Sequence, residues 1–331
     1  MSFLFPSQTI TFDAALRDLA SGSPKARAVA ARALGEVDGE TERRRAIDAL
    51  VRALDDDRPE VRAAACGSLG ELGELGPVPG LVKRLDDGAP AVRQNAAIAL
   101  GTLRAADGFE PLADKLANGP ADLRFQAATS LAEIDPMRAF DRVLAALADR
   151  DPQVAGAAAL SVGGIAANEA SLKSRALDAL GAQLQHADAG ARFDVAYALS
   201  ELDDARGTAA LGAAIADPER AWDAVTALGR VRAEPELMAA LAHKKTPDEA
   251  RTLAAGRLLA IADVPKARKV LGDALVHRKV HVRGIAIEEL TEIGGAWAVP
   301  LLEKLAKSIK GSELGEPIRA ALEAIAKRAG A

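Results

Sequence analysis

The residues that most often carry chemistry are scarce in this sequence. It has four histidines and one cysteine. Only His277 and His281 have a spacing that could place both side chains on one helix face. A zinc pair at i and i+4 needs a third ligand and, in the zinc proteases, a glutamate beside the first histidine. The segment here is HRKVHVR, whose positive charge disfavours a cation, so we expect no metal site and no cofactor.

The single cysteine, Cys66, cannot form an intramolecular disulfide, and it occupies an alanine-like position in a helical segment. We interpret it as a small core residue rather than a nucleophile. The first residues, MSFLFPSQTITF, lack the basic region of a signal sequence, and no later segment is long enough to span a membrane. We therefore expect a cytoplasmic protein with no membrane span.

The composition favours packed helices. Of 331 residues, 49 % are hydrophobic, but only seven Phe, two Trp and one Tyr are aromatic, and a core of Ala, Leu and Val suits helices better than sheets. The net charge is −5, yet residues 244–331 carry 16 Lys and Arg against 11 Asp and Glu. An acidic body with a basic end is unlike the surface of a general nucleic-acid-binding protein, so we do not expect nucleic acid as the partner.

A repeated pattern of fifteen residues organises the chain. RPEVRAAACGSLGEL at residues 58–72 returns as APAVRQNAAIALGTL at residues 89–103. The residue aligned with Arg62 recurs at intervals of about 31 residues, and we call the nine aligned residues the anchors: Arg27, Arg62, Arg93, Arg124, Ala155, Arg192, Ala221, Arg251 and Arg283. An apolar residue stands seven positions after every anchor, a regularity that chance does not explain.

Each repeat is predicted to contain two helices. A proline shortly before most anchors, as at Pro59 and Pro90, suits the first turn of a helix because its missing N–H would have no partner there. Aspartates before these prolines, such as Asp55 to Asp57, supply side-chain caps. After the anchor, apolar residues recur at helical spacing and mark one buried face. Another amphipathic segment, such as Ala46 to Leu54, lies between these helices.

The pattern D-x-P-x-V-R-x-x-A-A-x-A-L-G-x-L resembles the HEAT repeat, in particular the short HEAT-like repeat named after phycobilisome lyases. Tetratricopeptide and ankyrin repeats have similar periods, but their signature residues are absent. The resemblance implies an all-α fold, an α-solenoid in which about nine helical pairs stack into a right-handed superhelix with the second helices on the concave side. We predict an N-terminal extension at residues 1–12, a single repeat array at residues 13–310 and a capping helix within residues 311–331.

The resemblance also implies a structural role for the anchor arginines. In this family they resemble a ladder, in which each arginine reaches aspartates at the turn of its own or the adjacent repeat. We predict such contacts, rather than ligand binding, for Arg27, Arg62, Arg93, Arg124, Arg192, Arg251 and Arg283. Ala155 and Ala221 interrupt the ladder, and we expect a change of curvature there.

Enzymes with similar repeats give the alternatives. The HEAT-like hydroxylases carry His-Glu pairs for a di-iron centre, and this sequence has no His-Glu dipeptide. HEAT-like DNA glycosylases use a strongly basic groove, whereas the central repeats here are acidic. Phycobilin lyases match in scaffold residues only, without a chromophore-handling motif. We expect no catalytic residue, and a lyase-like enzyme or subunit, or a nucleic-acid-binding protein, stays as the alternative.

Positions one and five residues after the anchor face away from the packed stripe, so they should lie on the concave surface. Four of the ten aromatic residues occupy them. We predict an apolar partner-binding strip with a polar rim, made of Ile98, Phe125, Leu160, Phe193, Tyr197 and Trp222, flanked by Asn95, Gln126, Asp194 and Asp223. Such a composition is typical of protein-binding hot spots. The alternative is that helix rotation buries these rings between repeats.

A second candidate surface is a basic cluster near the C-terminal end, made of Lys266, Arg268, Lys269, Arg278 and Lys279. It is either a solvated face of the terminal repeats or an electrostatic contact with an acidic protein or an anionic membrane surface. We predict a non-catalytic scaffold or adaptor that binds a protein or peptide partner in its concave groove. The identity of the partner and the oligomeric state are left open.

Overall fold

The computed structural model describes residues 10–308 and 313–329. Twenty α-helices, joined by short turns and 3-10 segments, make up these two ranges, and neither range contains a strand. The predicted all-α class is therefore confirmed. The chain divides into two compact units between Glu169 and Ala170. We refer to the part before this point as unit 1 and to the part after it as unit 2.

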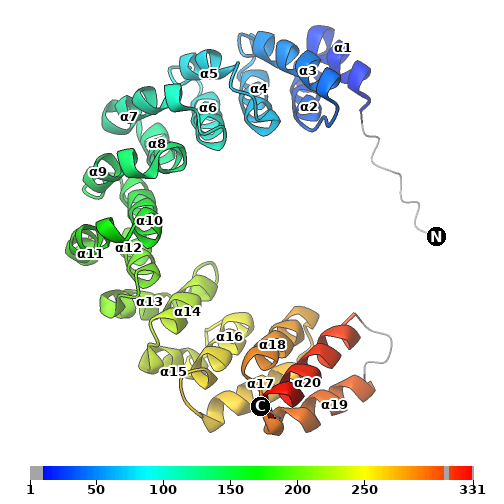
Figure 1. Cartoon of the computed structure of the whole chain (residues 1–331), viewed down its shortest axis with the longest axis vertical. Coiled ribbons are helices and arrows are strands. Elements are labelled where there is room, and N and C mark those ends of the chain that lie inside the picture. Colours follow the sequence, from blue (N-terminus) through cyan, green and yellow to red (C-terminus); the bar gives the residue numbers. More distant parts are fainter. Residues whose placement is uncertain (1–9, 309–312, 330–331) are drawn as a thin grey trace. The chain divides into compact units, whose positions relative to one another are not determined.

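Unit 1 contains five helical pairs, and the second helix of each pair carries the anchor. Its helices are α1 (Phe12–Ser21), α2 (Pro24–Gly35), α3 (Glu40–Ala53), α4 (Pro59–Leu72), α5 (Val78–Arg84), α6 (Pro90–Thr102), α7 (Phe109–Asn118), α8 (Ala121–Ile134), α9 (Pro136–Ala146) and α10 (Pro152–Asn168). Successive second helices pack side by side in one layer, and the first helices form the other. Within unit 1 the second helices line the inner side of the arc (Figure 1).

Unit 2 contains five further pairs. Its helices are α11 (Lys173–Ala182), α12 (Ala189–Glu201), α13 (Thr208–Ala214), α14 (Ala221–Arg230), α15 (Glu234–Ala242), α16 (Asp248–Leu259), α17 (Pro265–Leu275), α18 (Val280–Ile293), α19 (Val299–Ser308) and α20 (Gly315–Ala329). The sequence predicted α20 as a capping helix, and its contacts with α18 and α19 make it the second helix of a tenth pair.

Parts of the sequence-based description stay predictions. Residues 1–9 of the expected N-terminal extension lie outside the described ranges. The hand of the superhelix, the change of curvature at Ala155 and Ala221, and the continuity of the array across both units are likewise untested. None of the described helices is both long and apolar enough to cross a membrane.

Local sequence explains where the second helices begin. Four second helices of unit 1 have proline as their first residue: Pro24, Pro59, Pro90 and Pro152. Proline suits this position because its N–H would have no partner there. The helix α10 is also capped by Asp151, whose Oδ1 accepts the N–H of Gln153 at 2.9 Å. Pro120 and Pro247 lie one residue earlier, at the N-caps of α8 and α16.

Small residues let the second helices approach one another closely. The residue seven positions after each anchor of unit 1 is fully buried: Leu34, Leu69, Leu100, Leu131 and Val162. Next to Leu69, Gly70 lies against α6 so tightly that a Cβ on it would be 3.0 Å from Cα of Ala99. Counting along the helix places positions one and five after the anchor off this stripe. Ile98, Phe125 and Leu160 at such positions are exposed, whereas Ala28 is buried.

Candidate binding surface

The anchor arginines of unit 1 tie successive helical pairs together. Each donates to a backbone carbonyl in the turn before its own helix. Each also donates to an aspartate of the next pair at 2.7–2.8 Å, in the pairs Arg27–Asp56, Arg62–Asp87, Arg93–Asp122 and Arg124–Asp149. Hydrogen bonds from Arg62 hold the pKa of Asp87 below its ordinary value. The ladder is therefore present for these four arginines.

The ladder is not continued in unit 2. Arg192, Arg251 and Arg283 donate to carbonyls of the turns before their own helices. Arg251 also donates to Asp248, the first residue of its own helix, at 3.1 Å, so it contacts an aspartate of its own repeat but does not bridge to the next pair. Within the described ranges neither Arg192 nor Arg283 pairs with an aspartate, so the ladder predicted for these two residues is wrong. For Arg283 the cause is local. The aspartates of the unit 1 ladder stand 25 or 29 residues after their arginines, and the residues at those two distances from Arg283 are both serine, Ser308 and Ser312.

Three residues of the predicted strip lie exposed on neighbouring second helices of unit 1. Ile98 on α6, Phe125 on α8 and Leu160 on α10 are 42 %, 40 % and 40 % exposed. We call these three residues the apolar strip. The predicted rim residues Asn95 and Gln126 are half-buried on the same helices, and each makes a hydrogen bond within its own helix. The sequence therefore predicted the exposure of this part of the surface correctly.

A groove of about 460 Å³ lies between α8 and α10, and Leu160 is one of its walls. Its other lining residues include Thr129, Ala132, Glu133, Pro136, Gly164, Ile165 and Glu169. Apart from its chain neighbours and the backbone of its own helix, no atom lies within 4 Å of the place that a Cβ on Gly164 would take, so the groove is open beside Gly164. The sequence analysis missed this groove. The sequence feature that could have indicated the groove is Gly164. It stands nine positions after the anchor Ala155, where three other repeats of unit 1 have glutamate.

The aromatic residues of unit 2 differ in exposure. Phe193 on α12 is 7 % exposed and belongs to the core, so the prediction that it lies on the surface is wrong. Tyr197 packs partly against the same core, with its ring centroid 6.4 Å from that of Phe193. Arg220, in the turn before α14, lies over the Phe193 ring at 5.3 Å and covers it. Trp222 on α14 is 43 % exposed, as predicted.

The predicted polar rim of unit 2 is divided in the same way. Asp223 is exposed next to Trp222. Asp194 is half-buried, and burial raises its pKa although Arg220 opposes the shift. Of the predicted strip in unit 2, Trp222 and part of the Tyr197 ring therefore reach the surface.

The predicted basic cluster does not form one uniform patch. Its five residues lie on α17 and in the turn before α18: Lys266, Arg268, Lys269, Arg278 and Lys279. Arg268 donates to Asp263 at 2.5 Å, and Lys279 donates to Glu249 at 3.0 Å. The other three are exposed. An electrostatic contact through this cluster stays a prediction.

The two histidines with helical spacing lie beside carboxylates of α16. Nε2 of His281 is 2.6 Å from Oε1 of Glu249, and Nε2 of His277 is 3.4 Å from Oδ2 of Asp248. Burial alone would raise the pKa of Glu249, but hydrogen bonds from His281 and Lys279 lower it to about 2. Within residues 10–308 and 313–329, no group of three His, Cys, Asp or Glu side chains could hold a metal ion.

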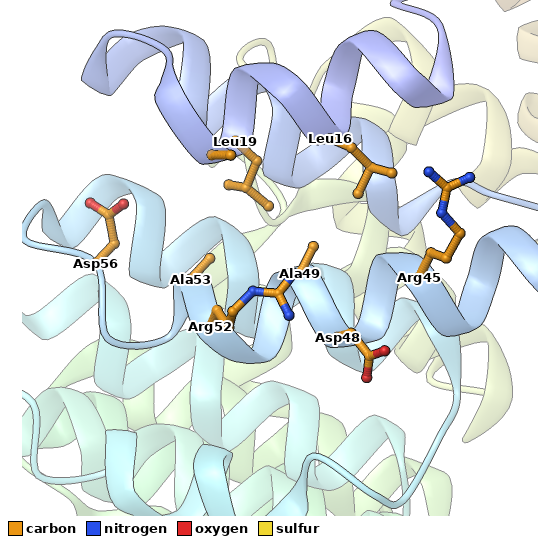
Figure 2. Close-up of a pocket in the computed structure, with 9 residues that line it drawn as sticks. Leu16, Leu19, Arg45, Asp48, Ala49, Arg52, Ala53 and Asp56 are labelled. Atoms are coloured by element: carbon orange, nitrogen blue, oxygen red, sulfur yellow. The ribbon is translucent and has the colours of Figure 1, made fainter.

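A hollow of about 590 Å³ lies between α1 and α3, in the outer layer of unit 1. Figure 2 shows Leu16 and Leu19 of α1 on one side of it and α3 on the other. On α3, Arg45 is held by Asp13 at 3.2 Å. The hollow reflects loose packing between these helices, because α1 packs mainly on α2 and α3 mainly on α4. Its lining carries both signs of charge and so favours no class of ligand.

Comparison with known proteins identifies the repeat. Residues 14–101 match the family of HEAT repeats. This range runs from the first turn of α1 to the last turn of α6. These residues are HEAT repeats. The same two-helix unit recurs in the helices that follow. The narrower assignment to the phycobilisome-lyase type of HEAT repeat stays a prediction. No curated protein matches the sequence at a significant level.

Solved structures of other repeat proteins share the fold. Importin beta is 15 % identical with a TM-score of 0.58, and the alignment covers 95 % of this chain and 52 % of importin beta. The complex of CpcE and CpcF of phycocyanin lyase from Nostoc sp. PCC7120 is 22 % identical over 83 % of this chain and 100 % of that chain, with a TM-score of 0.45. Designed armadillo repeat proteins for modular peptide recognition are 22 % identical over 58 % of this chain and 99 % of theirs, with a TM-score of 0.40. The importin beta comparison shows the fold alone, an α-solenoid.

Proposed function

We propose that this protein is a non-catalytic interaction scaffold or adaptor of the cytoplasm, and that it binds a protein partner on its second-helix face. The proposal rests on one observation. The apolar strip is exposed on three neighbouring second helices of unit 1, next to the groove between α8 and α10. Single exposed apolar side chains are common on protein surfaces, but a set on one face beside a groove is typical of an interaction site.

The surrounding structure supports this use of the surface. The arginine ladder fixes each helical pair of unit 1 to the next, so Ile98, Phe125 and Leu160 are presented by a framework that does not have to be ordered on binding. Pre-organisation of this kind lowers the entropic cost of association. Burial of one large apolar side chain under a partner contributes about 1.5 to 3 kcal/mol when it is complete.

The lining of the groove indicates what the partner brings. It contains two carboxylates, Glu133 and Glu169, and no cationic residue. Leu160 and Ile165 supply an apolar wall. A helix or extended segment with a large apolar side chain, followed or preceded by Lys or Arg, is complementary to this combination.

The test requires a purified partner. The full-length protein is used to capture it from a lysate of the source organism, mass spectrometry identifies it, and calorimetry measures its affinity for the wild type and for Phe125→Ser/Leu160→Ser. We expect binding at least about tenfold weaker, which corresponds to about 1.4 kcal/mol. The matched control is Met137→Ser on α9, since Met137 is 52 % exposed but lies off the strip. Equal affinities of the strip variant and the wild type contradict the proposal.

A further inference from the structure

A cavity of about 320 Å³ in unit 2 is lined by three arginines. It lies between the last turns of α14 and α16, and its lining residues are Thr226, Gly229, Arg230, Arg232, Arg257, Ala260 and Ile261. No acidic residue is among them. Arg230 and Arg232 are exposed and the Arg257 side chain is 42 % exposed, so solvent screens part of the repulsion between these guanidinium groups, and an anion between them would remove more of it. The charge balance of this cavity therefore depends on what else each arginine contacts.

Arg257 lines the cavity from a position at which the earlier repeats have a small side chain. Six residues after the anchor, every second helix from α2 to α14 has Ala or Ser, whereas α16 has Arg257. Gly229 of α14 makes room for it, because a Cβ on Gly229 would lie 2.9 Å from Cγ and Cδ of Arg257. Without that glycine, the stem of Arg257 could not lie against α14.

The carboxylate that faces Arg257 compensates it incompletely. Glu289 of α18 lies with Oε1 3.4 Å from Nη2 of Arg257, a distance longer than that of a good charge-assisted hydrogen bond. Burial raises the pKa of Glu289 to about 7, although Arg257 opposes the shift. A substantial fraction of Glu289 is therefore neutral at pH 7. The positive charge of Arg257 is then only partly compensated by Glu289, and an anionic group of a partner could interact with it.

The other two arginines have no carboxylate partner in the part of the chain that the structure describes. Nη1 of Arg230 donates to Oγ of Ser200 at 3.0 Å, and its guanidinium carbon lies 5.5 Å from the centroid of the Tyr197 ring. Both contacts are neutral, so they hold the guanidinium in place without cancelling its charge. Arg232 is exposed at the C-terminal turn of α14 and has a φ of 54°.

The helix ends supply too little negative charge to balance the cavity. The C-terminus of a helix carries about half a negative elementary charge, so α14 and α16 together offset about one of the three positive charges. We propose that this cavity binds a carboxylate group from an acidic segment of the protein partner. Guanidinium groups bind carboxylates and phosphates through the same charge-assisted hydrogen bonds, so a free inorganic anion is the other source of this chemistry.

The cavity continues the exposed face of α14. Trp222, Thr226 and Arg230 stand at successive steps of four residues, so they share one side of the helix, and Thr226 and Arg230 line the cavity. A partner segment with its acidic residue in the cavity is then close enough to cover Trp222 with a neighbouring side chain. This inference rests on the proposed function, because it names the chemistry of the same protein partner at a separate site in unit 2.

The test uses a variant that removes one guanidinium and suits the backbone. Arg232→Gly places glycine in a left-handed conformation, as Gly73 already is at the end of α4 with a φ of 78°. The matched control is Arg104→Gly, because Arg104 is exposed in unit 1, has a φ of 47° at the end of α6 and lies outside the cavity. Each variant loses one positive charge. The probes are an acetylated, amidated tetraglutamate peptide and inorganic phosphate, titrated calorimetrically into the full-length protein at 0.1 M salt.

Tetraglutamate is expected to bind the wild type and Arg104→Gly with the same affinity, and Arg232→Gly at least about tenfold more weakly. Absence of saturable binding to the wild type, or equal weakening in both glycine variants, overturns the proposal. Phosphate binding that is tighter than tetraglutamate binding and equally dependent on Arg232 also overturns it, since the site then belongs to a free anion.

The two proposals fail independently of each other. The Phe125→Ser/Leu160→Ser variant leaves unit 2 unchanged, so it should bind tetraglutamate as the wild type does whether or not it loses the protein partner. Retained partner binding in that variant contradicts the proposed function, whereas the tetraglutamate titrations decide the inference about the cavity.

Discussion

Arg62 and Asp87 join two successive helical pairs through two parallel hydrogen bonds. Nε and Nη2 of Arg62 donate to the two carboxylate oxygens of Asp87 at 2.8 and 2.7 Å. The Asp87 side chain is 4 % exposed, and that of Arg62 is 15 % exposed. Nη1 of Arg62 also donates to the carbonyl of Asp56 at 2.8 Å, so one guanidinium fixes the turn before its own helix and the turn of the next pair. For a charged pair that is this deeply buried, removing one partner is destabilising mainly because the remaining charged group stays buried without its hydrogen bonds.

We therefore expect Arg62→Ala to lower the free energy of unfolding by about 2 to 3 kcal/mol, since the buried Asp87 would lose both short hydrogen bonds from Arg62 and keep the longer charged contact with Arg84 at 3.5 Å. Urea denaturation followed by circular dichroism measures the change. The control is Arg44→Ala, because Arg44 and its partner Glu40 are 80 % and 68 % exposed, and we expect a loss below about 0.5 kcal/mol there. Similar small losses in both variants would show that the ladder does not stabilise the array.

Glu289 should make stability depend on pH near neutrality. Its pKa is about 7 in the folded protein against an ordinary value of 4.5, chiefly because of burial. Between these values the folded state binds more protons than the unfolded state, so the free energy of unfolding falls as the pH rises from about 4.5 through about 7. The total loss is about 3 kcal/mol at most, since one pKa unit corresponds to about 1.4 kcal/mol.

Glu289→Gln should remove this dependence and be more stable than the wild type at pH 8, with little difference at pH 5. Urea denaturation at pH 5, 6, 7 and 8 compares the two proteins. Glu292→Gln serves as the control, because Glu292 lies on the same helix and is exposed. A difference between wild type and Glu289→Gln that stays constant from pH 5 to pH 8 would contradict this account.

Phe193 and Trp222 should respond to truncation in opposite ways. Phe193 is 7 % exposed, so Phe193→Ala should lower the free energy of unfolding by about 3 to 4 kcal/mol through the cavity it leaves. Trp222 is 43 % exposed, so Trp222→Ala should cost less stability and weaken partner binding. Thermal denaturation and calorimetry with the purified partner separate the two effects. A larger loss of stability in Trp222→Ala than in Phe193→Ala would be inconsistent with these positions.

Cys66 should be unreactive in the folded protein. The side chain is fully buried, and burial raises the pKa of its thiol to about 12, so the reactive thiolate is scarce at pH 8 and covered by neighbouring side chains. We expect an aromatic disulfide reagent to modify Cys66 at pH 8 only when urea unfolds the protein. Rapid modification without urea would show that α4 opens locally.

Part of the candidate surface could be predicted from sequence because the exposure of its residues follows from helical period. The interval of about 31 residues and the proline before the anchor set where each second helix starts. The position of a side chain on that helix then follows from counting, as it does for Ile98, Phe125 and Leu160. The ladder in unit 1 was expected from the resemblance to the HEAT-like repeat rather than from helical counting.

Helical counting does not decide how far each helix is covered by its neighbours. Phe125 and Phe193 both stand one residue after an anchor, yet they are 40 % and 7 % exposed. Phe193 packs into the core formed with the following helices, and Arg220 of the following repeat also lies over its ring. The burial of a side chain in this way depends on residues of other repeats. The sequence pattern of one repeat therefore does not predict its exposed fraction.

The repeated helical pairs follow from local spacing in the sequence, because that spacing fixes which face of each helix is apolar. Only the tertiary structure brought Arg230, Arg232 and Arg257 around one cavity. They stand nine, eleven and six residues after their anchors on two different repeats, so no single repeat contains the cluster. Gly229 brings the three arginines together because its missing side chain leaves room for Arg257 of α16 against α14. The distance between packed helices depends on their contact and not on either helix alone.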